Sequence, residues 1–316
     1  MSQTTASLRR KIEGARDLRA VVSTMKALAA ASIGQYEKSV HALDGYYRTV
    51  QLGLSVCFRT GGPAAAAAER KKDIGMTGAV VFGSDQGLVG QFNDVVADYA
   101  AQTLAALPGN KKIWAVGERV HDRLALTGTP LAGLLAVPLS VKAIAPLVGH
   151  ILLQMLAPER VDGDVQWRRE DRDKISKLYL FYNNSKSGAV YAPIHQRLLP
   201  LDAAWRHDLA KLRWPTRNLP EVMGGGPATL QALIREYLFV SLFRACAESL
   251  ASENASRLAA MERAEKNIDQ LSADLHQTFY RLRQSKIDEE LFDVIAGVEA
   301  LAGTQQAIRP VDRGDG

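Results

Sequence analysis

Apolar side chains recur every three or four residues through the N-terminal part of this 316-residue chain. They occupy Leu8, Ile12, Ala15, Val22, Met25, Ala29, Ile33, Tyr36, Val40, Leu43, Tyr47, Val50, Leu54 and Cys57. Alternating steps of three and four residues are typical of a long helix that packs along one seam on a partner helix. We therefore predict a helix over Ser7–Cys57.

The C-terminal part repeats this pattern over a longer stretch. Its stripe runs through Leu250, Asn254, Leu258, Met261, Ala264, Ile268, Leu271, Leu275, Thr278 and Leu282, and resumes at Leu291, Val294, Val298 and Leu301. We predict one helix over Thr229–Leu301, capped by Thr229. So long a helix needs a partner along its seam, and the N-terminal helix is the candidate. We expect an antiparallel pair in which the longer C-terminal helix extends beyond its partner.

Proline separates these two ends from the middle of the chain. None occurs before Pro63 or between Pro227 and Pro310, as expected if both ends are helical, because proline breaks helix interiors. The middle alternates between strand and helix patterns, with strands expected at 79–84, 112–116, 134–137, 178–183 and 190–199, and helices at 94–107, 118–126 and 141–155. Such alternation predicts a mainly parallel, Rossmann-like sheet covered on both faces.

The predicted fold class is therefore α/β plus a long α-helical coiled coil, in which antiparallel terminal helices flank an inserted α/β domain. The expected division is an N-terminal coiled-coil helix at 1–62, the α/β domain at 63–227, a C-terminal coiled-coil helix at 228–303 and a tail at 304–316. Within the inserted domain, residues 64–72 are expected to form a linker or a helical tail, and the charged stretch 157–174 a surface loop.

Composition excludes several classes of protein. Hydrophobic residues make up 47% and charged residues 23% of the chain, as in foldable soluble proteins. The net charge of +5 is small for a nucleic-acid-binding protein. The two cysteines, Cys57 and Cys246, form neither a disulfide framework nor a zinc cluster. With no apolar run of about 18 residues, no membrane span is expected, and we expect a reducing, cytosolic location.

The turn after the first predicted strand is the strongest candidate for a binding site. It contains Ser84, Asp85, Gly87, Gly90 and Asn93. Its glycines can let backbone amides approach an anion; alternatively, this is a tight turn in which Asp85 or Asn93 caps a helix. The chain has no G-x-x-x-x-G-K-[ST] or G-x-G-x-x-G motif, and its six histidines lack metal-pair spacing. We predict no catalytic site, no cofactor and no metal.

Four sequence patches, in order along the chain, resemble the gamma subunit family of F-type ATP synthases. They are TMKALAAA at 24–31, SDQGL at 84–88 with Gly90 and Asn93, SENASRLAAM at 252–261, and Arg283-Gln284 followed by Ile287 and Glu290. The corresponding family patterns are T-x-A-M-K-M-V-A-A-A, S-D-R-G-L-C-G-x-x-N, S-E-x-A-A-R-M-x-A-M and R-Q-x-x-I-T-x-E. Departures at Gln86, Val89, Leu258 and 262–265 indicate a divergent branch of the family, such as an alternative bacterial F-type or N-type ATPase.

The resemblance implies the rotor shaft of the central stalk, which couples ion flow through a membrane ring to ATP synthesis or hydrolysis. It implies as partners the alpha and beta subunits, the epsilon subunit and the c-subunit ring, but no nucleic acid. The chain would be a peripheral protein on the cytoplasmic side of a bacterial membrane. Catalysis would belong to the alpha–beta ring.

The resemblance also implies partner contacts. Met25 and Lys26 match a contact with an acidic loop of the beta subunit, and Arg283 and Gln284 match a contact with a beta-subunit catch loop. Arg257 is a further contact candidate, although Glu253 lies four residues before it and the two can instead form a local pair.

Two other functions stay open. A coiled-coil adaptor with a partner-binding α/β head would self-associate through its apolar stripes. An enzyme with a nucleotide- or acyl-binding domain would bind its ligand at Gly87–Gly90, and the missing phosphate-binding motifs count against it.

Overall fold

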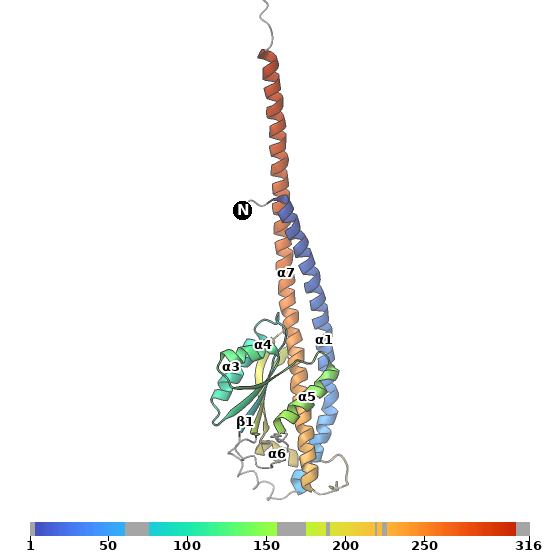
Figure 1. Ribbon diagram of the computed structural model, residues 1–316. Coiled ribbons are helices and arrows are strands. Elements are labelled where there is room, and N and C mark those ends of the chain that lie inside the picture. The colour runs from blue at the N-terminus through green and yellow to red at the C-terminus, as the bar shows by residue number, and fades with distance from the viewer. Residues whose placement is uncertain are drawn as a thin grey trace, which may run out of the picture. The chain divides into compact units, whose positions relative to one another are not determined.

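The computed structural model describes residues 4–60, 76–156, 175–187, 190–218, 220–222 and 226–307. The predicted linker at 64–72 and loop at 157–174 lie outside them. The chain forms two compact units, of which unit 1 comprises Met1–Met25 with Glu262–Gly316 and unit 2 comprises Lys26–Met261. Both long helices, α1 (Thr5–Thr60) and α7 (Gly226–Ala307), contribute to each unit (Figure 1). The division thus falls within the helices and not where they meet the α/β domain.

The predicted seam of α1 is confirmed. Leu8, Ala15 and Val22 are buried at intervals of seven residues in unit 1, and Ala29 and Tyr36 continue this spacing in unit 2. Burial at every seventh position is the signature of helices packed along a seam.

The stripe of α7 is confirmed only in part. Met261 and Ile268 are buried, again seven residues apart, but Leu271 is 51% exposed, so its predicted place in the seam is wrong. The helix also begins earlier than expected, at Gly226, so Thr229 lies inside the first turn and is not its N-cap. Pro227 is tolerated there because the first helical positions have no intrahelical partner for an N–H.

The two helices run antiparallel in each unit. In unit 1, Arg19 of α1 donates to Asp269 of α7 over 2.6 Å, and Arg9 of α1 lies with Arg283 of α7 along one groove. In unit 2, the Tyr46 hydroxyl donates to Glu236 over 2.6 Å, and a Cβ placed on Gly53 would lie 3.0 Å from the Leu233 side chain. Rising residue numbers in α1 therefore face falling numbers in α7, as predicted.

Unit 2 contains a five-stranded sheet with strand order β3-β2-β1-β4-β5. The strands are β1 (Met76–Phe82), β2 (Lys111–Val116), β3 (Leu131–Leu135), β4 (Ile175–Ser187) and β5 (Val190–Leu199). The first four are parallel and β5 pairs antiparallel to β4, which confirms the mainly parallel sheet. Strand β3 begins at Leu131, three residues earlier than predicted.

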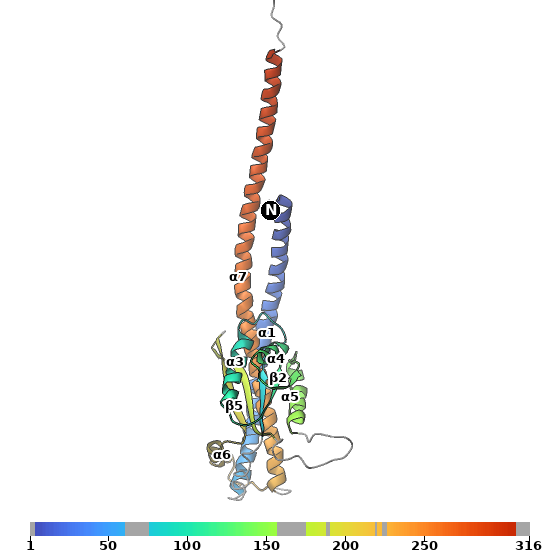
Figure 2. The same cartoon turned by 60° about the vertical axis from the view of Figure 1, so that its left-hand side comes forward.

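Both faces of the sheet are covered, as expected for parallel strands. Ala79 and Val81 of β1 pack on the side of α3 (Phe92–Ala105) and α4 (Glu118–Leu126). Val80 and Phe82, which alternate with them, belong to the core shared with α5 (Val141–Leu156). That second core also contains residues of α1 and α7. Figure 2 shows the stretches of both helices that run alongside the sheet. Within unit 2 the long helices are thus a layer of the α/β domain.

One short helix was not predicted. Helix α6 (Ala203–Ala210) follows β5, and its Trp205 ring packs on Tyr237 of α7 with ring centroids 4.8 Å apart. Across the described residues, no helix combines the length and the apolar character needed to cross a membrane.

Candidate functional site

The turn between β1 and α3 is closed by the side chains that the sequence singled out. The Ser84 backbone N–H donates to Asn93 Oδ1 over 2.9 Å, and Asn93 Nδ2 donates to Ser84 Oγ over 2.9 Å. Ser84 Oγ in turn donates to the Gln86 carbonyl over 2.9 Å. Ser84 and Asn93 are both buried, so these bonds satisfy polar groups that water cannot reach. Asn93 therefore fixes the turn and does not cap α3.

Asp85 joins this turn to two distant parts of unit 2. Its Oδ1 accepts from the backbone N–H of Glu118, at the start of α4, over 3.0 Å. Its Oδ2 accepts from the backbone N–H of Val137 over 2.9 Å. The carboxylate thus occupies the positive end of α4, where a free anion would otherwise be favoured. The geometry favours the tight-turn interpretation of the sequence over the anion-binding one.

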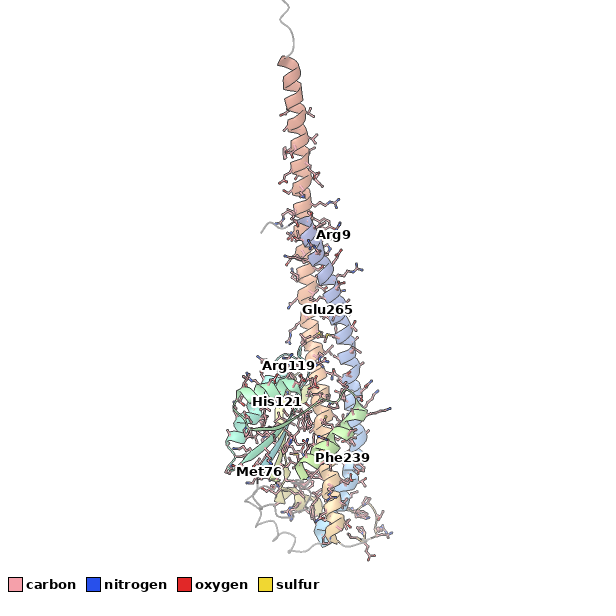
Figure 3. The ribbon with its side chains drawn as sticks, in the orientation of Figure 1. Arg9, Met76, Arg119, His121, Phe239 and Glu265 are labelled. Atoms are coloured by element: carbon pink, nitrogen blue, oxygen red, sulfur yellow. The ribbon has the colours of Figure 1, made fainter. Side chains whose placement is uncertain are left out.

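The exposed tip of the turn has an unusual backbone conformation. Leu88 has φ 62° and a side chain that is 63% exposed, and Gly90 has φ 61°. The left-handed region suits glycine but strains leucine. The position of Gly87 does not require glycine, since a Cβ there would lie 3.9 Å from Arg119 Nη2, which is an ordinary contact. Arg119 is labelled in Figure 3. The turn therefore holds a large apolar side chain in solvent at some conformational cost.

Helix α7 holds the same turn from the other side. The Ser256 hydroxyl donates to the Val89 carbonyl over 2.5 Å, and both residues are buried. This bond links the 84–93 turn to the 252–261 patch of α7, two segments that are far apart in the sequence. No local sequence pattern predicts such a bond, because its partners are 167 residues apart.

Arg257 forms the local pair that the sequence left open. Its Nη2 donates to Glu253 Oε1 over 2.7 Å, and the two side chains are 12% and 7% exposed. Burial raises the pKa of Glu253; Arg257 opposes that shift, and the negative charge of Asp85 adds to it. The pair is therefore an internal element of unit 2, and no contact with a partner is needed to account for Arg257.

The remaining predicted contact residues lie on the long helices. Met25 and Lys26 are half-buried on α1, on either side of the boundary between the two units. Arg283 and Gln284 are exposed on α7 in unit 1. The structure thus leaves the second pair open to a partner.

Arg283 lines a surface groove that no sequence pattern predicted. The groove has a volume of about 470 Å³ and is lined by the first turns of α1 and one face of α7: Thr5, Ala6, Arg9, Phe279, Arg283, Lys286, Ile287 and Glu290. Three of these side chains are cationic and one is acidic, so the groove is suited to acidic groups. Arg9 is labelled in Figure 3.

Beyond this groove α7 continues with apolar side chains in solvent. Leu291, Phe292, Val294, Ile295 and Val298 are between 45% and 69% exposed. At 3.6 residues per turn these positions cover nearly half of the helix circumference. A contiguous apolar surface of this kind marks an interaction site. Phe292 and Ile295 were missing from the predicted stripe because they lie beside it.

Histidine, cysteine, aspartate and glutamate are the side chains that bind metal ions most often in proteins. Among the residues that the structure describes, no group of three or more histidine, cysteine, aspartate or glutamate side chains could hold a metal ion. Cys57 and Cys246 are buried free thiols.

Comparison with known proteins extends these observations. Residues 4–301 match the ATP synthase family model. The gamma chain of ATP synthase from Brevibacillus brevis is 26% identical over 96% of this chain and 100% of its own length, and that from Brucella anthropi is 27% identical over 93% and 98%. A chain in the Euglena gracilis mitochondrial ATP synthase structure of OSCP, F1 and c-ring has the same fold, with a TM-score of 0.64, 16% identity and coverage of 99% of this chain and 98% of that one.

Proposed function

Since this chain belongs to the ATP synthase gamma family and is a gamma subunit of the central stalk, we propose that it couples ion flow through a membrane ring to ATP synthesis or hydrolysis. The observation that carries the proposal is the exposed apolar end of α7 in unit 1. Val294 and Val298 are each more than 60% exposed there, and such a surface requires a partner that covers it. An apolar bearing formed by a ring of alpha and beta subunits would provide that cover.

The chain itself has no catalytic role in this proposal. Nucleotide chemistry belongs to the alpha–beta ring, and the shaft acts by presenting different faces to different catalytic sites, a mechanical form of coupling between them. The site geometry supports this division of labour. At the turn after β1, where a doubly wound fold would bind a phosphate, Asp85 fills the N-terminus of α4 with a carboxylate of the chain.

The proposed partners are the alpha and beta subunits, the epsilon subunit and the c-subunit ring. Among the similar structures, the Euglena complex contains F1 and a c-ring, and a Tetrahymena thermophila complex contains a central stalk and a c-ring. By extension, this chain would be a peripheral protein at the cytoplasmic side of a bacterial membrane. The departures at Gln86 and Val89 support a divergent branch of the family.

Co-expression with the alpha and beta subunits of the same organism tests the proposal. We expect one copy of the chain per ring, and ATPase activity that the chain lacks alone. The variant Leu291→Asp with Val294→Asp should fail to join the ring, whereas the change Asp288→Glu with Glu289→Asp, at exposed acidic positions just before them, should join normally. If the chain stays alone or self-associates while the other subunits assemble, the adaptor interpretation replaces this one.

A further inference from the structure

A largely buried carboxylate joins helix α7 to the sheet in unit 2. Glu248 Oε2 accepts from Asn184 Nδ2 of β4 over 2.9 Å, and Glu248 Oε1 accepts from Arg244 Nε over 2.7 Å. The Glu248 side chain is only 14% exposed. Burial raises the pKa of the Tyr182 phenol of β4, and the negative charge of Glu248 adds to that rise. Both oxygens of one carboxylate therefore accept hydrogen bonds, and one of these bonds reaches a different element of the fold.

The face of α7 around Glu248 is otherwise apolar and nearly smooth. Its side chains in the core of unit 2 are Ala245, Cys246, Ala247, Leu250 and Ala251. A helix keeps its register, meaning its rotation and its shift along a partner, through ridges of side chains that enter grooves. Small side chains form only low ridges. Burial of this face stabilises its contact with the sheet, but the hydrophobic effect is not directional and specifies register weakly.

A second hydrogen bond holds α7 eight residues further along the helix. The Ser256 hydroxyl donates to the Val89 carbonyl over 2.5 Å. Eight residues correspond to about two helical turns, or ~12 Å along the axis. Hydrogen bonds are directional, so two of them at different heights restrain both rotation and sliding, whereas one restrains a single point. Specification of register is the best-attested role of buried polar groups in helix packing.

We propose that Glu248 is a positioning residue that sets the register of α7 against the sheet, so that torque on the α/β domain passes into the shaft without slip. This inference rests on the proposed stalk function, because α7 extends from unit 2 into unit 1. Glu248 takes no part in the chemistry and acts through its bond to Asn184. A carboxylate that only stabilised the fold would differ in one respect, because its loss would lower stability and coupling together.

The variant Glu248→Met with Asn184→Leu tests this role, because it replaces the link by apolar side chains. Arg244 is 44% exposed and stays solvated. Such a replacement is often neutral or stabilising, so the urea midpoint of the variant should equal or exceed that of the unaltered chain. In membrane vesicles that carry the complete enzyme, the ratio of ATP-driven ion pumping to ATP hydrolysis should fall by about three- to tenfold.

A control variant removes a polar link elsewhere in unit 2. Arg123 of α4 is bonded to Asp98 of α3, on the opposite face of the sheet from α7. Both helices lie outside the contact between α7 and the sheet. Asp98→Leu with Arg123→Met should therefore leave the pumping ratio unchanged.

Spin-label distances measure the register without reference to function. Gln102→Cys on α3 and Gln231→Cys on α7 place labels at exposed positions of unit 2, whereas the native Cys57 and Cys246 are buried. Double electron–electron resonance on the full-length chain should give one narrow distance distribution. The apolar variant should give a broader or shifted one, because a register change of one residue turns α7 by about 100°.

A conservative variant separates the hydrogen bond from the charge. Glu248→Gln keeps an oxygen that can accept from Asn184, so it should keep the narrow distribution and most of the coupling. The proposal is overturned if Glu248→Gln behaves like the apolar variant, or if the apolar variant keeps the original distances or the original pumping ratio. It is also overturned if the urea midpoint falls in step with the ratio. If even the unaltered chain fails to join the alpha–beta ring, the stalk function is wrong instead, and the distances report on the register independently.

Discussion

Glu253 and Arg257 form a buried ion pair one helical turn apart on α7, with Oε1 and Nη2 separated by 2.7 Å. The second oxygen of Glu253 and the Nε of Arg257 have no hydrogen-bond partner among the described residues. Each charge is therefore compensated mainly by the other. Removal of one partner would leave an isolated charge in a site that water barely reaches.

We expect Arg257→Met to lower the free energy of unfolding of unit 2 by about 3 kcal/mol, the usual cost of orphaning a buried charge. The double variant Arg257→Met with Glu253→Leu should recover most of this loss. Urea denaturation followed by circular dichroism measures both. Arg19→Met is the control, because the Arg19–Asp269 pair is about half exposed and should cost under about 1 kcal/mol. Equal losses for Arg257→Met and Arg19→Met would show that burial of the pair has no energetic consequence.

The raised pKa of Glu253 predicts a pH dependence. Burial raises the pKa of this carboxyl above its ordinary value of 4.5, so the native state holds the proton more tightly than the unfolded state. The contribution to stability is complete below pH 4.5 and declines as pH rises through the native pKa. Glu253→Gln cannot titrate, so its unfolding free energy relative to the unaltered chain should increase between pH 4.5 and pH 8. Parallel pH profiles for the two proteins would contradict this.

Asp85 should matter for stability more than an exposed aspartate does. It accepts from the backbone N–H groups of Glu118 and Val137, and Asp85→Ala leaves both donors unpaired. We expect a loss of about 2 kcal/mol in the free energy of unfolding. Amide hydrogen exchange at Glu118 and Val137 should accelerate. Asp98→Ala, which removes only a partly exposed pair with Arg123, should cost less than about 1 kcal/mol and leave both amides protected.

Alanine substitution at two glycines of unit 2 should change the free energy of unfolding in opposite directions. Gly117, which precedes α4, has φ 116°, and a Cβ there would lie 2.8 Å from the Ser84 backbone. Gly117→Ala should lower the free energy of unfolding by about 3 kcal/mol. Gly45 lies inside α1 with nothing within 4 Å of an added Cβ, so Gly45→Ala should raise it by about 1 kcal/mol. Thermal and urea melts measure both, and a tolerated Gly117→Ala would refute the steric account.

Arg283 and Gln284 should affect coupling without affecting the fold. Both are exposed on α7 and neither forms a hydrogen bond or ion pair with a residue that the structure describes, so Arg283→Ala with Gln284→Ala should leave the fold intact. If they bond to the beta subunit, loss of a charge-assisted hydrogen bond should lower the ratio of ATP-driven ion pumping to ATP hydrolysis by roughly tenfold in membrane vesicles. Arg281→Ala, an equally exposed neighbour, is the control. Unchanged pumping in the double variant would remove these residues from the proposed contact.

Local patterns in the sequence determined the elements of this protein. The absence of proline and the seven-residue spacing of Leu8, Ala15 and Val22 specify long helices, because helix formation depends on backbone compatibility and one apolar face. The alternation of strand and helix in the middle specifies a covered parallel sheet. Element boundaries shifted by a few residues, as at Leu131, where propensity changes gradually along the chain.

Only the tertiary structure decided how these elements combine. Asp85 is bonded to groups 33 and 52 residues away, and Ser256 to a carbonyl 167 residues away. The sequence identified these residues through a family resemblance but could not assign their partners. A hydrogen bond between distant segments produces no repeating pattern in the sequence. For the same reason it did not show that α1 and α7 form a layer of the sheet's own core. An apolar stripe predicts that one face of a helix is buried, but only the folded structure shows which residues cover that face.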